Sequence, residues 1–282
     1  MSVTPLPRVM LEPMMTAALA EDLGRAGDVT SVSVIPADAR ARFALVTRDD
    51  GVVAGMQMAA LAFEIIDPEV QFVAHRRDGD RVPAGTELAY VSGSAQSLLT
   101  AERVALNFLS HLSGVATATA TIARAISHTD TKVCCTRKTT PGLRAVEKHA
   151  VRAGGGVNHR FGLDDAILIK DNHIAVAGSL SEAVRRAKDF AGHLMPIEVE
   201  VDSLDQLREL QTNPVAAVLI DNFSPELAAE AVALVGDTMV VEASGRITVE
   251  TAPGLAEAGV HLVSAGWITH SAAVLDIGLD DT

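Results

Sequence analysis

Short apolar segments recur at a regular interval through the second half of the chain, and each is followed by a stretch with helical spacing. Four of them end near Glu200, Asp221, Glu242 and Ser264, so successive ends lie 21, 21 and 22 residues apart. Apolar strands that alternate with amphipathic helices are typical of a parallel sheet with both faces covered. The even spacing favours an α/β barrel, and an open doubly wound sheet stays as the alternative.

Three of the predicted helices begin with a serine that can cap them. Ser179 is followed three residues later by Glu182, and Ser203 by Gln206, which is the spacing of a capping box. Ser224 stands directly before a proline, an order typical of an N-cap and a first helical residue. These signals predict helices over residues 179–191, 203–210 and 224–235.

The first 95 residues lack this alternation. Helical spacing around residues 14–23 is followed by short segments rich in β-formers and by a turn-rich stretch at 78–88, which we interpret as a plain hairpin. Biotinyl and lipoyl carriers have a similar turn, but they need an exposed lysine that this stretch lacks. We expect strands at residues 41–48, 70–76 and 87–93, followed by one or two helices over 94–126.

Composition argues against several classes of protein. A formal net charge of −13 and 3% aromatic residues disfavour a nucleic-acid partner. The two cysteines, Cys134 and Cys135, are adjacent and would point to opposite faces of a strand, so we expect no disulfide and a reducing compartment. Because no uncharged apolar window of about 18 residues occurs, we expect a cytoplasmic protein without a membrane partner.

One part of this acidic chain is basic. Between residues 137 and 170 there are seven lysines and arginines against three acidic residues. A local surplus of positive charge predicts that an anion is held here. The basic residues are Arg137, Lys138, Arg144, Lys148, Arg152, Arg160 and Lys170, and the acidic residues are Glu147, Asp164 and Asp165.

Basic side chains fall where predicted strands end. Arg137 and Lys138 follow the strand-like segment KVCC, and Lys170 follows AILI. An arginine fork and a lysine ammonium together can hold carboxylates or phosphates, whereas one charged residue alone would simply lie on a solvated turn. The aspartate after Lys170 could neutralise it instead. His159 and Arg160 lie in another connection between predicted elements. We therefore predict a shared anion site at the carboxyl ends of the strands.

Two carboxylates end other predicted strands. Glu200 and Asp221 could accept hydrogen bonds from sugar hydroxyls or hold Mg²⁺ through water. They could also form salt bridges with the basic residues, and both roles are compatible.

Glycine-containing turns follow the last two strands. EASGRIT, which we expect to lead into a helix near Thr248, and SAGWITHS place backbone amides where barrels commonly bind phosphate. The AGGGVNHR segment fits neither a P-loop nor a dinucleotide-binding fingerprint. The chain has no HExxH, paired CxxC or GxSxG motif, and its nine histidines show no ligand spacing, which disfavours a structural metal, a metalloprotease and a serine hydrolase.

Seven motifs, in order, resemble those of the quinolinate phosphoribosyltransferase family: TRKTTPGLR, GGGVNHR, LIKDNH, EVEVDS, LIDNF, EASG and THS. With LLTAERVALNFLSHLSG they extend the resemblance over nearly the whole chain. It implies an N-terminal α/β sandwich-like domain, residues 1–108, and an incomplete, seven-stranded α/β barrel, residues 109–270, with residues 271–282 packing with the first domain. It also implies a homodimer, or an oligomer of dimers, with active sites at the subunit interface.

The resemblance implies the activity of a carboxylating nicotinate-nucleotide diphosphorylase, a glycosyltransferase of NAD biosynthesis. Such an enzyme transfers the phosphoribosyl group of 5-phosphoribosyl-1-diphosphate to quinolinate and gives nicotinate mononucleotide, pyrophosphate and CO₂, with Mg²⁺ as cofactor. Quinolinate carries two carboxylates and the donor carries phosphate and pyrophosphate. The local positive charge would therefore serve both substrates.

The resemblance also implies roles for individual residues. Lys138, Lys170, Glu200 and Asp221 are expected to be catalytic, with Mg²⁺ held mostly through substrate and water near the two carboxylates. Quinolinate is expected to be bound by Arg103 of the neighbouring subunit and by Arg137, Lys138, His159, Arg160 and Lys170, with Lys138 nearer the pyrophosphate. The ribose and phosphate groups are expected at Glu200, Asp221, Ser244, Gly245, Arg246, Ser264, Ala265, Gly266 and His270.

Three positions depart from the family pattern. Cys135 stands where an aspartate is frequent, and Arg246 and Trp267 stand where small residues are common. The last two flank the expected phosphate loops, so the details of phosphate binding stay open.

Three alternative functions are compatible with parts of this pattern. A molybdenum-transport-associated paralogue shares the fold but departs at the LIKDNH motif, so Lys170 argues against it. A nicotinate phosphoribosyltransferase would bind a monocarboxylate and need fewer cations. A catalytically idle, anion-binding barrel would not need Glu200 and Asp221 beside the cations.

Overall fold

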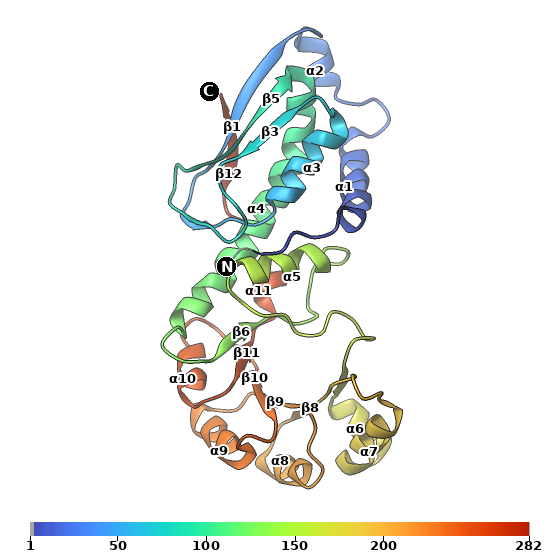
Figure 1. The fold of residues 1–282 in the computed structure, drawn as a ribbon, viewed down its shortest axis with the longest axis vertical. Coiled ribbons are helices and arrows are strands. Elements are labelled where there is room, and N and C mark those ends of the chain that lie inside the picture. Colours follow the sequence, from blue (N-terminus) through green and yellow to red (C-terminus); the bar gives the residue numbers. More distant parts are fainter. Residues whose placement is uncertain (1–2, 282) are drawn as a thin grey trace. The chain divides into compact units, whose positions relative to one another are not determined.

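The computed structural model describes residues 3–281, which divide into two compact units (Figure 1). The first unit takes in residues 3–120, 140–155 and 269–281, and the second takes in 121–139 and 156–268. Neither unit is a continuous stretch of chain.

The first unit contains an antiparallel sheet of four strands in the order β12–β1–β5–β3. β1 (Arg40–Thr47) pairs with β5 (Glu87–Ser94) on one side and with β12 (Ile277–Asp281) on the other. β3 (Gln71–Ala74) pairs with the far side of β5. The three strands predicted in the first 95 residues are confirmed. The fourth, β12, comes from the end of the chain and has no counterpart among the predicted strands.

The turn-rich stretch at 78–88 connects β3 to β5, and these two strands pair antiparallel, so the predicted hairpin is confirmed. Its strand β4 (Arg81–Val82) pairs with β2 (Gly51–Val52), about 30 residues earlier in the chain. Asp50 reinforces this pairing, because its Oδ1 accepts a hydrogen bond from the Ala84 amide at 2.8 Å. The connection of the hairpin therefore carries a further, long-range strand pairing that the sequence did not predict.

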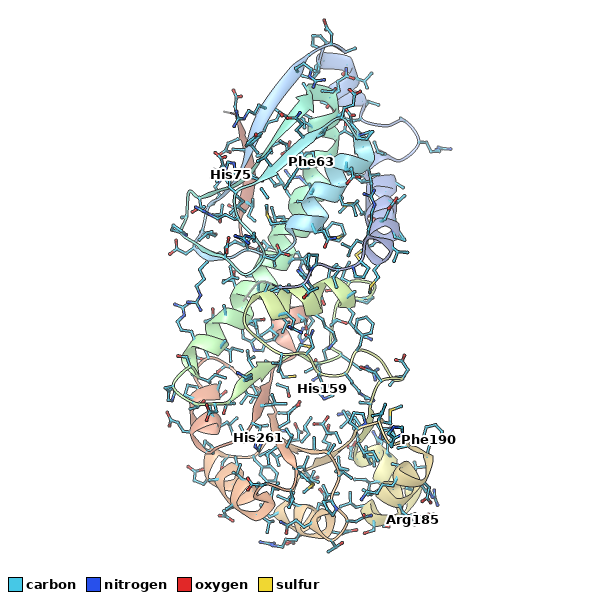
Figure 2. All side chains as sticks on the ribbon, viewed as in Figure 1. Phe63, His75, His159, Arg185, Phe190 and His261 are labelled. Carbon is cyan, nitrogen blue, oxygen red and sulfur yellow. The ribbon has the colours of Figure 1, made fainter. Side chains whose placement is uncertain are left out.

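Helices cover the antiparallel sheet of the first unit. Phe63 on α3 (Met56–Ile66) is 1% exposed (Figure 2). Its ring centroid lies 6.1 Å from that of Phe72 on β3, so α3 packs on the sheet. The segment predicted as one or two helices is a single helix, α4 (Ala95–Ala125), whose last five residues belong to the second unit. The helices are α1 (Arg8–Leu23), α2 (Val29–Val34), α3 (Met56–Ile66), α4 (Ala95–Ala125) and α5 (Arg144–Ala153).

The second unit contains a parallel sheet in the order β6–β11–β10–β9–β8–β7. All six strands lie where the apolar segments predicted them, which confirms the α/β barrel-like fold. The family resemblance implies a seventh strand; beside these six, Val157 forms one isolated parallel bridge with Cys134 at the β6 edge. Glycine and asparagine around Val157 are poor strand formers, which accounts for a single bridge there. The strands are β6 (Lys132–Cys134), β7 (Ile167–Ile169), β8 (Ile197–Val201), β9 (Ala217–Asp221), β10 (Val240–Ser244) and β11 (Leu262–Ser264).

Helices of the second unit follow its strands and lie along the outer side of the sheet (Figure 1). The three predicted serine caps are confirmed: Ser179, Ser203 and Ser224 each accept a hydrogen bond from the amide three residues later. The glutamate of the predicted capping box, Glu182, instead bonds to neighbouring arginines. These helices are α6 (Asp171–Ala177), α7 (Leu180–Phe190), α8 (Leu204–Gln211), α9 (Pro225–Val235) and α10 (Ala252–Glu257), followed by α11 (Trp267–His270) at the boundary between the units.

The helix expected near Thr248 begins later, at Ala252. The Thr248 hydroxyl accepts hydrogen bonds from the amides of Glu250 and Thr251 at 3.2 and 3.3 Å. A threonine that bonds its own following backbone forms a turn in competition with the helix. The loop after β10 is therefore longer than the sequence suggested.

Candidate functional site

A cavity of about 440 Å³ lies at the carboxyl ends of the parallel strands in the second unit. Residues that end or follow different strands meet there because all the strands run in one direction. Eight residues with predicted roles line it: Arg137, Lys138, His159, Arg160, Lys170, Glu200, Ser244 and Ser264.

Other residues with predicted roles are not part of this lining. Asp221 lies two residues after Leu219, which does line the cavity, so strand alternation places both on the same side of the sheet. Arg103 and His270 belong to the first unit. The rest, Gly245, Arg246, Ala265 and Gly266, directly follow the lining residues at the ends of β10 and β11.

Lys170 forms an ion pair with a carboxylate on the adjacent strand. Its Nζ donates a hydrogen bond to Oε2 of Glu200, the penultimate residue of β8, which pairs with β7. Asp171, the other candidate partner, instead accepts a hydrogen bond from the Asn172 amide through Oδ1. The Lys170 amide donates to Nδ1 of His173 at 2.9 Å, so this histidine orients the start of α6 beside the cavity.

Arg160 is held with part of its guanidinium unsatisfied. Its Nη1 donates to the carbonyl of Ala166 at 2.8 Å, but its buried Nε has no hydrogen-bond partner within the described part of the chain. Burial, and then the positive charge of Arg137, lower the pKa of Arg160 from its ordinary value. A bound anion would relieve both effects, since it would accept the free hydrogen and offset the repulsion.

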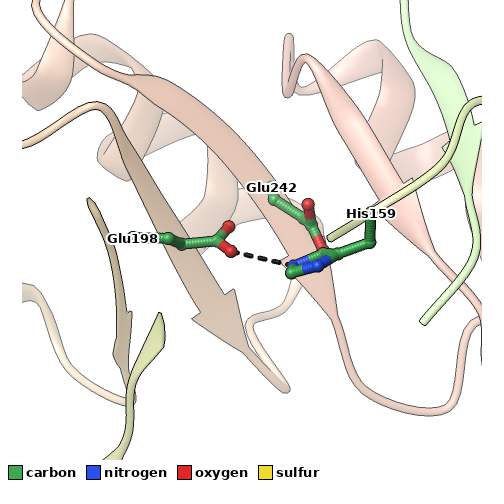
Figure 3. A group of neighbouring side chains, drawn as sticks. All are labelled: His159, Glu198 and Glu242. Atoms are coloured by element: carbon green, nitrogen blue, oxygen red, sulfur yellow. Dashed lines mark hydrogen bonds and ion pairs between the residues drawn. The ribbon is translucent and has the colours of Figure 1, made fainter. Parts of the chain in front are cut away.

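His159 lies between two glutamates that the sequence interpretation did not single out (Figure 3). Its Nε2 is 2.9 Å from Oε2 of Glu198 and 3.8 Å from Oε1 of Glu242. Glu198 is on β8 and Glu242 on β10, and Glu242 is 2% exposed. Burial and the charge of Glu198 raise the pKa of Glu242 to about 7.

Strand alternation contained a signal for both glutamates. Glu198 and Glu200 are two residues apart on β8, so their side chains share one face. Glu200 and Glu242 are both aligned with Leu219 of the strand between them. Residues aligned across parallel strands point to the same side, so Glu242 faces the cavity with Glu200.

The two expected phosphate loops approach the site closely. Gly245 has φ +105°, and a Cβ there would lie 2.3 Å from Oδ1 of Asn222. A Cβ on Gly266 would lie 2.9 Å from Cδ of Lys138, so a larger residue there would require the lysine side chain to shift. A hydrogen bond connects the loop after β10 with the start of α11, since Nε1 of Trp267 donates to the Ile247 carbonyl at 2.8 Å.

Structural comparison shows close likeness over the entire chain. The crystal structure of NadC from Streptococcus pyogenes has a TM-score of 0.95 at 40% identity and covers 98% of both chains. The nicotinate-nucleotide pyrophosphorylase from Francisella tularensis has a TM-score of 0.95 at 35% identity, with 100% of this chain and 99% of that chain covered. Human nicotinic acid phosphoribosyltransferase, at 15% identity and a TM-score of 0.57, shares the fold alone.

Sequence comparison agrees with the structural likeness. The probable carboxylating nicotinate-nucleotide pyrophosphorylase of Bacillus subtilis (strain 168) is 42% identical over 97% of this chain and 94% of its own length. The corresponding protein of Mycobacterium leprae (strain TN) is also 42% identical, over 93% of this chain and 94% of its own. Two domain families, described as the N-terminal and C-terminal domains of quinolinate phosphoribosyl transferase, match residues 28–113 and 115–280. The chain therefore belongs to the quinolinate phosphoribosyltransferase family.

Proposed function

We propose that the protein transfers the phosphoribosyl group of 5-phosphoribosyl-1-diphosphate to quinolinate, forming nicotinate mononucleotide, pyrophosphate and CO₂. The observation that carries this proposal is that Arg137, Lys138, Arg160 and Lys170 line one cavity in a chain of net charge −13. A dicarboxylate and a pyrophosphate both need concentrated positive charge. Relatives named carboxylating nicotinate-nucleotide pyrophosphorylases support the same reaction.

The quinolinate carboxylates are assigned to Arg137, Arg160 and Lys170. The unsatisfied Nε of Arg160 supports this assignment, because a carboxylate oxygen would complete its hydrogen bonding. Lys138 is assigned to the pyrophosphate, since its side chain runs beside Gly266 and the phosphate loops. The 5-phosphate is assigned to backbone amides of residues 244–246 and 264–266.

Mg²⁺ is the proposed cofactor, held mainly through substrate oxygens and water. Glu200 lines the cavity and Asp221 ends the adjacent strand, so two carboxylates are available on one side of the sheet. Carboxylate oxygens suit Mg²⁺, which tends to keep several of its waters. The ion would neutralise charge on the departing pyrophosphate.

The chemistry of the reaction fits a site built from charged side chains. Departure of pyrophosphate leaves an oxocarbenium-like ribosyl group, which the pyridine nitrogen attacks, and positioning and electrostatics carry most of that step. The ring nitrogen becomes cationic and stabilises the carbanion that loss of CO₂ leaves at C2. No organic cofactor is needed for either step.

The test of the proposed function is the choice between two pyridine acids. We expect quinolinate to be turned over with release of one CO₂ per mononucleotide, and kcat/KM for nicotinate to be lower by about 100-fold or more, because nicotinate leaves cations unpaired. Steady-state assays with each acid measure this ratio. Comparable kcat/KM values for the two acids would contradict the proposal.

We also propose a homodimer, or an oligomer of dimers, with shared active sites. Arg103 on α4 has a side chain 65% exposed, with only Glu102 at 3.8 Å as an ion-pair partner in the described chain. An exposed arginine of this kind can complete the site of a neighbouring subunit.

Subunit mixing tests the shared site. Arg103→Ala and Lys170→Ala should each be nearly inactive alone, and an equimolar mixture should recover roughly a quarter of wild-type activity, because half of randomly formed dimers contain one intact site. The assay follows mixing, after subunit exchange has been shown with tagged chains. Exchange without recovery would rule out a shared site.

The cytoplasm is the proposed compartment. Cys134 and Cys135 are both buried and form no disulfide among the described residues, which suits a reducing environment. Within residues 3–281 no helix combines the length and apolar character needed to cross a membrane.

A further inference from the structure

Glu242 is a buried acid at the wall of the cavity that the predicted site residues do not include. It is 2% exposed, and its Oε1 is enclosed without a hydrogen bond from any described residue. An unpaired carboxylate in such a place is costly, so the group tends to hold a proton instead. Glu242 therefore differs from the exposed or ion-paired carboxylates around it.

The groups that face Glu242 come from several elements. Glu198 on β8 is a like charge, and Cys135 just after β6 acts in the same direction, whereas a hydrogen bond from Ser264 on β11 favours the ionised form. His159, whose Nε2 lies 3.8 Å from Oε1 of Glu242, also favours the ionised form, and more strongly than Ser264 does. Burial and Glu198 outweigh these two opposing contacts and raise the pKa of Glu242 to about 7. The acid is thus largely protonated below neutral pH.

Hydrogen bonds define the tautomer of His159. The Arg160 amide donates to Nδ1 at 2.8 Å, so Nδ1 carries no proton. Nε2 therefore carries the proton and donates it to Glu198 at 2.9 Å.

The same tautomer disfavours a metal in this cluster. The ligand atoms of His159, Glu198 and Glu242 lie within 4.8 Å of one another, which is a spacing that a metal ion could use. Ligation through Nε2 would remove its proton while Nδ1 still accepts the Arg160 amide. The ring would then be an imidazolate, so the geometry favours a shared proton over a metal.

We propose that Glu242 is the acid that protonates the ring carbon exposed by decarboxylation. The proposal rests on the proposed function. The bond between C2 and its carboxyl group breaks, CO₂ leaves, and the electron pair stays on C2. The proton of Glu242 then forms the new C–H bond, and the resulting carboxylate regains a proton from water. Glu198 is a positioning residue, because its charge keeps Glu242 protonated and holds the His159 ring between them.

The first experiment uses Glu242→Gln, which keeps the shape of the side chain but has no acidic proton. Rapid-quench assays with carboxyl-labelled quinolinate measure pyrophosphate and CO₂ separately. We expect CO₂ release to slow by about 10²- to 10⁴-fold, because an unprotonated carbanion recaptures CO₂ in the cavity. Pyrophosphate release should stay within about threefold of wild type.

A matched control removes a buried carboxylate in the first unit. Glu147 is fully buried and bonds to His111 at 2.9 Å. Glu147→Gln should lower the melting temperature and leave the ratio of CO₂ to pyrophosphate release unchanged.

The second experiment uses Glu198→Gln and does not depend on the stability of the first variant. In the wild type, the rate of CO₂ release should fall as the pH rises through about 7, because the acid form of Glu242 is lost. Removing the like charge lowers the pKa of Glu242, so this fall should move to lower pH by about one unit. A purely structural role of Glu198 would not move the profile.

Several outcomes would overturn the proposal. They are CO₂ release at the wild-type rate in Glu242→Gln, equal slowing of both products, an unmoved pH profile in Glu198→Gln, or a stoichiometric transition metal that is lost in Glu242→Gln. Failure of the wild-type protein to release CO₂ from quinolinate would instead contradict the proposed function.

Discussion

The two sheets of this molecule distribute ionisable residues differently. In the parallel sheet every strand runs the same way, so Lys138, Lys170 and Glu200 follow or end different strands and still line one cavity. In the antiparallel sheet β1 and β12 run in opposite directions, so strand ends alternate between edges. Its ion pair between Arg48 and Asp280 is exposed. Strand direction alone therefore concentrates chemistry in the second unit.

Buried carboxylates differ between the units in the same way. Glu147 of the first unit accepts the Thr140 amide through Oε2 at 3.0 Å and contacts His111 through Oε1 at 2.9 Å. Glu242 of the second unit keeps Oε1 without a hydrogen bond in the described chain. A buried acid with both oxygens satisfied stabilises structure, whereas one with an open oxygen is available to a ligand or a proton transfer.

The largest expected effect tests whether the first unit serves stability. Phe63→Ala should lower the free energy of unfolding by about 3–5 kcal/mol, because it empties a position that is 1% exposed. Chemical denaturation measures the change. Phe190→Ala, at a position 82% exposed, is the matched control and should stay within about 0.5 kcal/mol. An unchanged free energy of unfolding in Phe63→Ala would contradict the assignment of the first unit to stability.

The next effect tests whether the carboxyl ends of the parallel strands carry the chemistry. Lys170→Ala should mainly raise KM for quinolinate, and Lys138→Ala should mainly lower kcat and weaken the phosphoribosyl donor, each by roughly 30- to 1000-fold. Kinetics with each substrate varied in turn, beside thermal melts, measure this. Lys132, at the opposite end of β6 from Lys138, is the matched control and should leave both constants unchanged when replaced by alanine.

Two results would contradict that assignment. Near-wild-type kinetics in both lysine variants would remove the anion site. A loss confined to donor affinity in Lys170→Ala, with no change in Lys138→Ala, would reverse the roles of the two lysines.

The smallest effect separates stability from chemistry inside the second unit. Ser224 caps α9, since its Oγ accepts the Leu227 amide at 3.3 Å. Ser224→Ala should cost about 1 kcal/mol of stability and leave kcat/KM for quinolinate unchanged. Ser224→Asn keeps an acceptor and should restore the loss in denaturant melts. A drop in kcat/KM with either variant would mean that the outer helices are coupled to the site.

The candidate site was predictable where charge and strand ends coincided. Arg137, Lys138 and Lys170 follow apolar segments, and the structure places all three at one cavity. Glu198 and Glu242 were missed as a pair because they lie 44 positions apart in the chain and meet only across the sheet. The partner of Lys170 was also open, since Asp171 and Glu200 are both nearby in sequence or in the sheet.

By itself the sequence determined the features that depend on near neighbours along the chain. The serine caps and the six apolar strands belong to this class, because a cap bonds within three residues and a strand needs only a short apolar run. The tertiary structure alone decided the pairing of β12 with β1, the single bridge that Val157 forms at the β6 edge, and the raised pKa of Glu242. Each of these depends on groups far apart in the chain, where burial and long-range hydrogen bonds outweigh local preference.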